Sequence, residues 1–168
     1  ARPRQRAVGD LATATEAALD ELVAGAAAIV HLAGRAHVLA DTAPDPGALY
    51  QAANVVATKR LAAAAVRAGV RRFVFASTIK VHGEATMPGR PIRADDPFAP
   101  HDAYARSKVE AERALAAMAA GTSLDAIVLR LPLVYGPRVK GNFLTLLDAV
   151  AREAWLPFGS VANRRDFL

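Results

Sequence analysis

The sequence predicts an α/β fold built around a parallel β-sheet. Short apolar runs rich in β-branched residues alternate with long alanine-rich amphipathic runs, which is the pattern of strands joined by crossover helices. Two of the long runs end in glycine, Gly69 and Gly121, a common C-terminal signal of helices. With 168 residues, 53% of them hydrophobic, the chain is long enough to bury one ordinary core.

Three short apolar runs predict the strands of this sheet. They cover residues 28–32 (AIVHL), 72–76 (RFVFA) and 126–130 (AIVLR). Continuous apolar runs of this length are typical of buried strands. We also expect Val8 to close a further strand that starts at or before Ala1.

Four runs with helical periodicity predict the helices, at 13–23, 49–68, 103–119 and 142–154. The second and third lie between predicted strands and therefore form two complete crossovers. A proline-rich stretch that contains Pro91 and Pro97 predicts a loop between the second strand and the helix that follows.

The composition excludes several classes of protein. The absence of cysteine excludes a disulfide scaffold, a thiolate metal site and a cysteine nucleophile, and it fits a reducing, cytoplasmic location. The longest apolar stretches, 26–33 and 61–66, are far shorter than the ~20 residues of a membrane helix. The net charge of +5 comes from scattered arginines without interleaved aromatic residues. We therefore expect no membrane, nucleic-acid or metal partner.

Tyr104 and Lys108 are the first candidates for chemistry. Asp102 is placed to cap their helix, and a spacing of four residues puts both side chains on one face, one turn apart. An ammonium near a phenol favours the phenolate, which lowers a tyrosine pKa of about 10 towards neutrality. The pair alone is also typical of a solvated helix.

Ser77 and Thr78 follow the strand predicted at 72–76. Ligands of open α/β sheets bind at the carboxyl ends of strands, where a hydroxyl can bond the same substrate oxygen that a tyrosine protonates. A plain Ser/Thr turn is the alternative interpretation. Together with Tyr104 and Lys108, these hydroxyls predict a site that moves a proton while a cofactor moves a hydride.

Four motifs extend this interpretation to a family. They are VFAST at 74–78, VHG at 81–83, YARSK at 104–108 and LRLPLVYGP at 129–137. In order and spacing they resemble the extended short-chain dehydrogenases/reductases, and more narrowly the NAD-dependent epimerases/dehydratases that act on nucleotide sugars. The resemblance spans essentially the whole chain.

The resemblance implies a Rossmann-like, doubly wound parallel sheet with helices on both faces. Residues 1–130 would form the dinucleotide-binding domain, and 131–168 would begin a nucleotide-sugar-binding lobe. Tyr104 would be the catalytic acid/base, Lys108 would hold the nicotinamide ribose and lower the tyrosine pKa, and Thr78 would bond the sugar oxygen.

The implied cofactor is NAD, with NADP not excluded, because the residue that reads the ribose 2′ position would precede Ala1. The cofactor-binding residues that the resemblance implies are Asp10, Leu11, Leu32, Ala33, Gly34, Asn54, Ser77, Tyr104, Lys108 and Leu131. Some have plainer interpretations: Asp10 as a turn residue, Gly34 as the end of a strand and Asn54 as a solvent-facing helical residue.

The implied substrate is a nucleotide sugar. Asn142 and Phe143 match a segment that holds the diphosphate at a helix N-terminus, which is a natural anion site. Arg165 matches an arginine that grips the diphosphate with its planar fork, and Thr78 completes the substrate contacts. Arg165 is otherwise one more solvated cation.

The chain departs from the family at three places. It lacks the opening glycine-rich turn of the dinucleotide site, so we expect it to be part of a longer chain, truncated at both ends; a complete chain would bind the cofactor weakly and show no turnover. His82 replaces the usual tyrosine. Ile79 and Lys80 stand where the sugar 4,6-dehydratases carry an acidic pair, which argues against dehydration.

The expected function is therefore that of an NAD-dependent nucleotide-sugar 4-epimerase. Tyr104 would take the proton of the sugar 4-hydroxyl as hydride leaves C4 and later returns. The alternatives are a nucleotide-sugar 4-ketoreductase or dehydrogenase, which uses the same residues, and a non-catalytic dinucleotide-binding module. A homodimer paired through helices 49–68 and 103–119 is expected.

Overall fold

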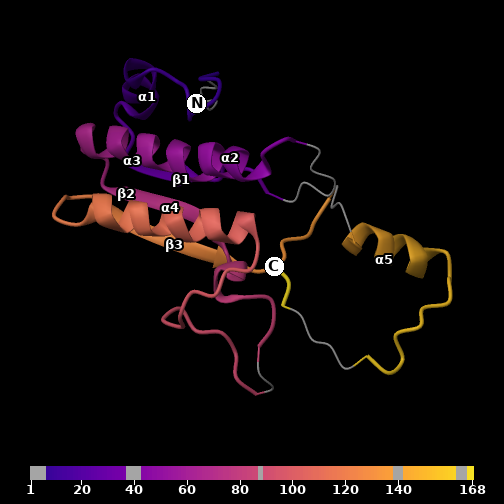
Figure 1. Cartoon of the computed structure of the whole chain (residues 1–168). Helices are drawn as coiled ribbons and strands as arrows, with labels where there is room; N and C mark the ends of the chain where they lie inside the picture. Colours follow the sequence, from indigo (N-terminus) through magenta and orange to yellow (C-terminus); the bar gives the residue numbers. More distant parts are fainter. Residues whose placement is uncertain (1–6, 37–42, 87–88, 138–141, 162–165) are drawn as a thin grey trace. The chain divides into compact units, whose positions relative to one another are not determined.

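The computed structural model describes residues 7–36, 43–86, 89–137, 142–161 and 166–168. The chain forms two compact units, Ala1–Arg130 and Leu131–Leu168. In chain order, the elements are α1 (Glu16–Val23), β1 (Ala28–His31), α2 (Pro46–Tyr50), η1 (Gln51–Val56), α3 (Ala57–Arg67), β2 (Arg72–Thr78), η2 (Ile79–His82), α4 (Ala103–Ala119), β3 (Asp125–Leu131) and α5 (Asn142–Ala151). Figure 1 shows α3 and α4 lying side by side along the strands.

The three strands form one sheet in the order β1-β2-β3. β1 and β2 are parallel, with Ala28 opposite Arg72 and His31 opposite Phe75. The helical segments between the strands make the crossovers that a parallel sheet requires. The predicted α/β fold is confirmed, and each strand lies within two residues of its expected bounds.

The core lies between the helices and one face of the sheet. Phe73 and Phe75 project from alternate positions of β2 and are completely buried. They join one cluster with apolar residues of α1, α3 and α4, namely Leu19, Val23, Leu61, Ala62, Ala64, Ala65, Ala111 and Leu115. Val30, on the opposite face of β1, is 62% exposed in the part of the chain that the structure describes.

The helix predicted at 49–68 contains an unexpected change of winding. It is observed as α2, the π-helical segment η1 and α3 in succession, with Asn54 buried inside η1. A π-helical turn rotates the side chains that follow it and often marks a functional site. Gly69 and Gly121 adopt positive φ angles of 67° and 74° after α3 and α4, as their positions predicted.

Two other expectations need correction. Val8 lies in irregular chain rather than at the end of a strand, and the residues before Ala7 are outside the described ranges. The helix predicted at 142–154 ends at Ala151, because Glu153 adopts a positive φ of 53° that a right-handed helix does not allow.

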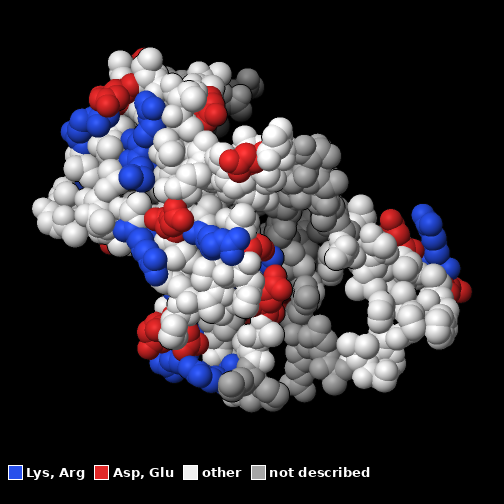
Figure 2. Space-filling model, in the orientation of Figure 1, with Lys and Arg blue, Asp and Glu red and all other residues white. Residues whose placement is uncertain are grey.

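Charged side chains of both signs are mixed over the surface. Figure 2 shows Lys and Arg interspersed with Asp and Glu on the face in view. Several of them form ion pairs, including Arg67 with Asp20 at 2.6 Å and Arg72 with Asp125 at 3.2 Å. Within the described ranges, none of the helices combines the length and the apolar character that crossing a bilayer requires.

Candidate active site

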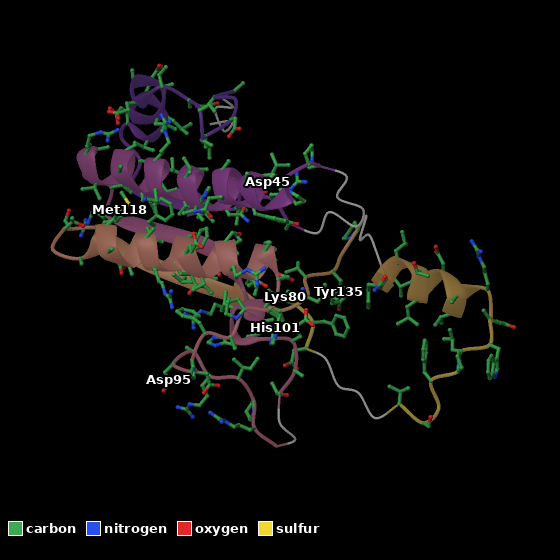
Figure 3. All side chains as sticks on the ribbon, viewed as in Figure 1. Asp45, Lys80, Asp95, His101, Met118 and Tyr135 are labelled. Carbon is green, nitrogen blue, oxygen red and sulfur yellow. The ribbon has the colours of Figure 1, made fainter. Side chains whose placement is uncertain are left out.

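The first turn of α4 positions Tyr104. The Asp102 carboxylate caps the helix by accepting a hydrogen bond from the Ala105 amide at 2.6 Å, and it also accepts one from the Lys80 ammonium at 2.7 Å. Figure 3 shows Lys80 and His101 beside the start of α4. The cap and the ion pair together hold the turn from which the Tyr104 side chain projects.

Thr78 meets Tyr104 at the carboxyl end of β2. The Thr78 side chain forms a hydrogen bond with the Tyr104 side chain and accepts a second one, from the Lys80 amide, at 3.3 Å. Thr78 is buried and ends its strand, so the backbone fixes the position of its hydroxyl. The structure therefore brings together two of the three predicted catalytic side chains.

Lys108 lies one turn further along α4 and is 5% exposed. Its ammonium donates a hydrogen bond to the Ala76 carbonyl at 2.8 Å and lies 4.4 Å from the centre of the Phe75 ring. Burial lowers the pKa of Lys108 to about 8, against the opposing effect of the Glu112 carboxylate. A buried ammonium with these partners is a strong hydrogen-bond donor held beside the end of β2.

The pKa of Tyr104 does not follow the prediction. Burial of the phenol raises it, and the neighbouring Asp102 and Tyr50 add to the rise. The hydrogen bond from Thr78 and the positive charge of Lys80 act in the opposite direction. The prediction that Lys108 lowers this pKa is wrong for the described residues, because the Lys108 ammonium points to the Ala76 carbonyl instead.

Asn54 and Gly34 pack against the same part of α4. The Asn54 amide donates to Ser107 Oγ at 2.8 Å and to the Arg35 carbonyl at 3.1 Å, and its oxygen accepts from the Arg35 amide at 2.8 Å. A Cβ atom on Gly34 would lie 2.7 Å from Asn54 Oδ1 and 3.5 Å from Lys108 Nζ. A side chain at position 34 would collide with this amide, so glycine lets the chain after β1 approach Asn54 closely. Asn54 is completely buried, so the solvent-facing alternative for it is wrong.

Three other predicted cofactor residues lie around one hollow in the surface. Leu11, Leu32 and Ala33 line an apolar hollow beside β1 with a volume of about 430 Å³. Asp10 is exposed, and its carboxylate accepts a hydrogen bond from the Ala12 amide at 2.9 Å, which is the local turn of the plainer interpretation. Ser77 is buried and donates its hydroxyl to Glu112.

The predicted substrate residues lie in the second unit. Asn142 and Phe143 begin α5, and the Phe143 ring is 5.3 Å from the Tyr135 ring and 5.2 Å from the Phe167 ring, between centres. Leu131, the last residue of β3, is the first of this unit. Arg165 lies outside the described residues.

Sequence reasoning missed Ser107 and Glu112 as parts of the site. Glu112 follows Lys108 by four residues, so helical spacing was the available signal; Ser107 has no such signal, because its partner Asn54 is distant in the sequence. Among the described side chains, no group of three or more His, Asp and Glu residues comes together that could hold a metal ion.

Comparison with known proteins identifies the family that this chain resembles. The model of the NAD-dependent epimerase/dehydratase family matches residues 2–168. The chain is 41% identical over 158 residues to UDP-glucose 4-epimerase from Vibrio cholerae, covering 94% of this chain and 48% of that protein. The chain therefore spans about half the length of this relative.

Solved structures give the same fold. The structure of MoeE5 in complex with UDP-glucose and NAD matches with a TM-score of 0.74 and 32% identity, over 95% of this chain and 52% of that one. DesIV, a dTDP-glucose 4,6-dehydratase from Streptomyces venezuelae solved with NAD bound, matches with a TM-score of 0.76 and 28% identity, over 95% and 49%.

Proposed function

The chain belongs to the NAD-dependent epimerase/dehydratase family, and from that premise we propose that it carries the acid–base part of a nucleotide-sugar 4-epimerase. The observation that carries the proposal is the hydrogen bond between Thr78 and Tyr104 at the carboxyl end of β2, with the buried Lys108 ammonium one helical turn away. The relative from Vibrio cholerae supports a UDP-hexose as the substrate class.

In this proposal Tyr104 exchanges a proton with the sugar 4-hydroxyl, and Thr78 orients the same oxygen by hydrogen bonding. When bound, NAD would supply the hydride acceptor and donor for this chemistry, and the positive charge of its oxidised ring would favour a deprotonated Tyr104. Burial raises the pKa of Tyr104, so the phenol is protonated in the described structure and would have to release this proton before it accepts the one from the sugar hydroxyl.

The chain's own residues fit the cofactor at the end of β1. Gly34 brings the backbone against Asn54 and Lys108 without a side chain in between. Lys108, with a buried ammonium that has further donor capacity, would hold the ribose hydroxyls. Leu11, Leu32 and Ala33 would contact the cofactor from the hollow beside β1. Asp10, Ser77 and Leu131 complete the proposed cofactor contacts.

The 4,6-dehydratase alternative is weakened by Lys80. This residue stands where dehydratases carry an acid, and its ammonium is paired with Asp102 at 2.7 Å and Glu84 at 3.4 Å. No carboxylic acid at this position is available to protonate a leaving hydroxyl. A ketoreductase would use Thr78, Tyr104 and Lys108 in the same way. Its need for external NAD(P)H distinguishes it from an epimerase.

The remaining parts of the proposal concern substrate binding, assembly and location. Asn142, Phe143 and Arg165 would bind the nucleotide diphosphate. Exposed apolar side chains on the helices beside the site, such as Leu49 and Val56, support a homodimer that pairs through them. A cytoplasmic enzyme is proposed on the absence of cysteine and of a membrane-crossing helix in the described ranges.

Replacing Tyr104 by phenylalanine tests the proposal in the protein that carries this chain. We expect Tyr104→Phe to lower kcat for UDP-glucose epimerisation at least ~100-fold, because the proton carrier is lost, while NAD remains bound. Tyr50→Phe is the matched control. The Tyr50 ring lies 6.1 Å from the Tyr104 ring, between centres, but the proposal assigns proton transfer only to Tyr104.

The assay is conversion of UDP-glucose without added cofactor, with bound NAD measured by its absorbance. Turnover that requires external NADH would identify the reductase instead. Retention of full activity by Tyr104→Phe would show that the phenol carries no proton and would favour the non-catalytic module.

A further inference from the structure

Glu112 is a buried carboxylate that the proposed reaction does not use. It lies on α4 one turn beyond Lys108 and is 4% exposed. Arg130 approaches it with two nitrogens, Nε at 3.1 Å and a terminal nitrogen at 2.8 Å from Oε2. Ser77 donates a hydrogen bond to its other oxygen. A buried carboxylate is tolerated because this fork and hydroxyl satisfy it.

The bond to Ser77 links Glu112 to both sides of the candidate site. Ser77 lies between Ala76, whose carbonyl accepts the Lys108 hydrogen bond at 2.8 Å, and Thr78, whose side chain bonds Tyr104. The position of Ser77 therefore sets the positions of two groups that face the proposed reaction. Glu112 fixes that position from α4, the helix that also carries Lys108.

Arg130 extends the contact to the loop between η2 and α4. One terminal nitrogen donates to the Ala94 carbonyl at 2.6 Å and to Nε2 of His82 at 3.0 Å, and the guanidinium lies 4.9 Å from the centre of the Phe98 ring. Since a guanidinium only donates, His82 Nε2 accepts, and its Nδ1 donates to the Pro97 carbonyl at 3.2 Å.

On the premise of the proposed function, we infer that Glu112, paired with Arg130, is a positioning residue that holds Lys108 as an ammonium ion and fixes the end of β2 for proton transfer. Glu112 touches neither substrate nor cofactor in this role. It acts through Ser77 on the backbone and through its negative charge on Lys108.

The charge has a direct consequence for Lys108. Burial pushes the pKa of Lys108 down to about 8, and the Glu112 carboxylate opposes that shift. Removing the carboxylate charge without changing its shape lowers this pKa further. Lys108 then loses its proton closer to neutral pH, and a reaction that needs the ammonium ion loses activity on the alkaline side at a lower pH.

Glu112→Gln tests this role, because it removes the carboxylate charge while the amide oxygen still accepts the Ser77 bond. The amide nitrogen then faces two donor nitrogens of Arg130, so the variant also breaks the pair with Arg130. We expect kcat to fall ~10-fold or more while KM for UDP-glucose changes less than ~3-fold, and the alkaline limb of the kcat profile to move to lower pH. Asp20→Asn, which removes the exposed charge partner of Arg67, is the control. We expect it to leave kcat, KM and the alkaline limb of the kcat profile unchanged.

A second readout does not depend on turnover. A titration of lysine-labelled protein by NMR follows the lysine signals, to which this chain contributes four, and Lys108→Met assigns the one from Lys108. We expect the Lys108 pKa to be lower in Glu112→Gln than in the unmodified protein. If the protein proves inactive on nucleotide sugars, this result still supports the role of Glu112 while the proposed function fails.

Ser77→Ala provides an independent variant if Glu112→Gln does not fold. It removes the link to β2 and keeps the charge, so we expect a lower kcat with the alkaline limb in place. An unmoved Lys108 titration in Glu112→Gln, or full kcat in Ser77→Ala, would overturn the inference, because the pair would then serve only to stabilise the fold.

Discussion

Individual side chains in this site combine a buried position with an ionisable group. Lys108 is 5% exposed and keeps one hydrogen bond from its ammonium to a backbone carbonyl. Tyr104 is partly buried against Thr78, and burial raises its pKa. Such placements cost stability, and proteins keep them where a reaction needs the group.

Lys108→Met is expected to stabilise the fold while it abolishes activity. The folded-state pKa of about 8 lies below the ordinary value of 10.5, so the charged form is disfavoured by folding at neutral pH. Removing the charge should add about 1–3 kcal/mol to the free energy of unfolding at pH 7. The loss of the hydrogen bond to the Ala76 carbonyl offsets part of this increase.

The stability that Lys108→Met gains over the unmodified protein should decrease between pH 8 and 10.5. Over that range the folded protein releases the Lys108 proton before the unfolded one does, so the unmodified protein becomes more stable as pH rises. Urea unfolding at pH 7 and pH 10 checks this. A Lys108→Met variant that is less stable at pH 7 would show that the ammonium is a net stabilising contact.

At the scale of elements, α4 organises the site because its start and its middle have different tasks. Asp102 caps the first turn and anchors Lys80, while the buried face further along carries Ser107, Lys108 and Glu112. The π-helical η1 turns Asn54 towards the same face, where it bonds Ser107. Two neighbouring helices thus align their polar side chains at the end of β2.

Asp102→Ala is expected to loosen the first turn of α4. Loss of the cap should cost about 1–2 kcal/mol of unfolding free energy, and the freed turn should lower kcat because Tyr104 is two residues away. Asp102→Asn keeps the cap but weakens the ion pair with Lys80, so its stability should fall less. Equal losses in the two variants, measured by urea unfolding, would assign the effect to the ion pair.

Across the whole molecule, the buried face of the sheet carries one ionisable side chain from β1. His31 lies between Phe73 and Phe75, with ring centres 5.8 and 5.7 Å away, and its Nε2 is 3.0 Å from the Thr58 hydroxyl. Burial, assisted by the positive charge of Lys108, lowers the pKa of His31 to about 4. The core therefore holds a neutral imidazole.

The stability of the molecule should fall as pH drops from 6.5 to 4. In this window the unfolded state binds a proton at His31 and the folded state does not, so about 3 kcal/mol is lost by pH 4. His31→Gln removes the titrating group and should flatten this part of the pH profile. Identical profiles for both proteins, from urea unfolding at several pH values, would exclude His31 as the cause.

Local features of the sequence were enough to predict the order of the elements and the catalytic candidates. The strand at Arg72–Thr78, the helix at Ala103–Ala119 and the glycine after it follow from apolar runs, periodicity and the positive φ that glycine tolerates. The spacing of Tyr104 and Lys108 likewise depends only on helix geometry. These signals act over a few residues, so the sequence alone determined them.

Only the tertiary structure decided which distant groups meet and how buried they are. Asn54 bonds Ser107, and Arg130 pairs with Glu112, because the crossover helices pack over the sheet at particular positions that no local spacing encodes. The same packing partly removes Tyr104 from water and so raises a pKa that helical spacing alone predicted would fall. Desolvation depends on every neighbour of a group at once, and those neighbours come from all parts of the chain.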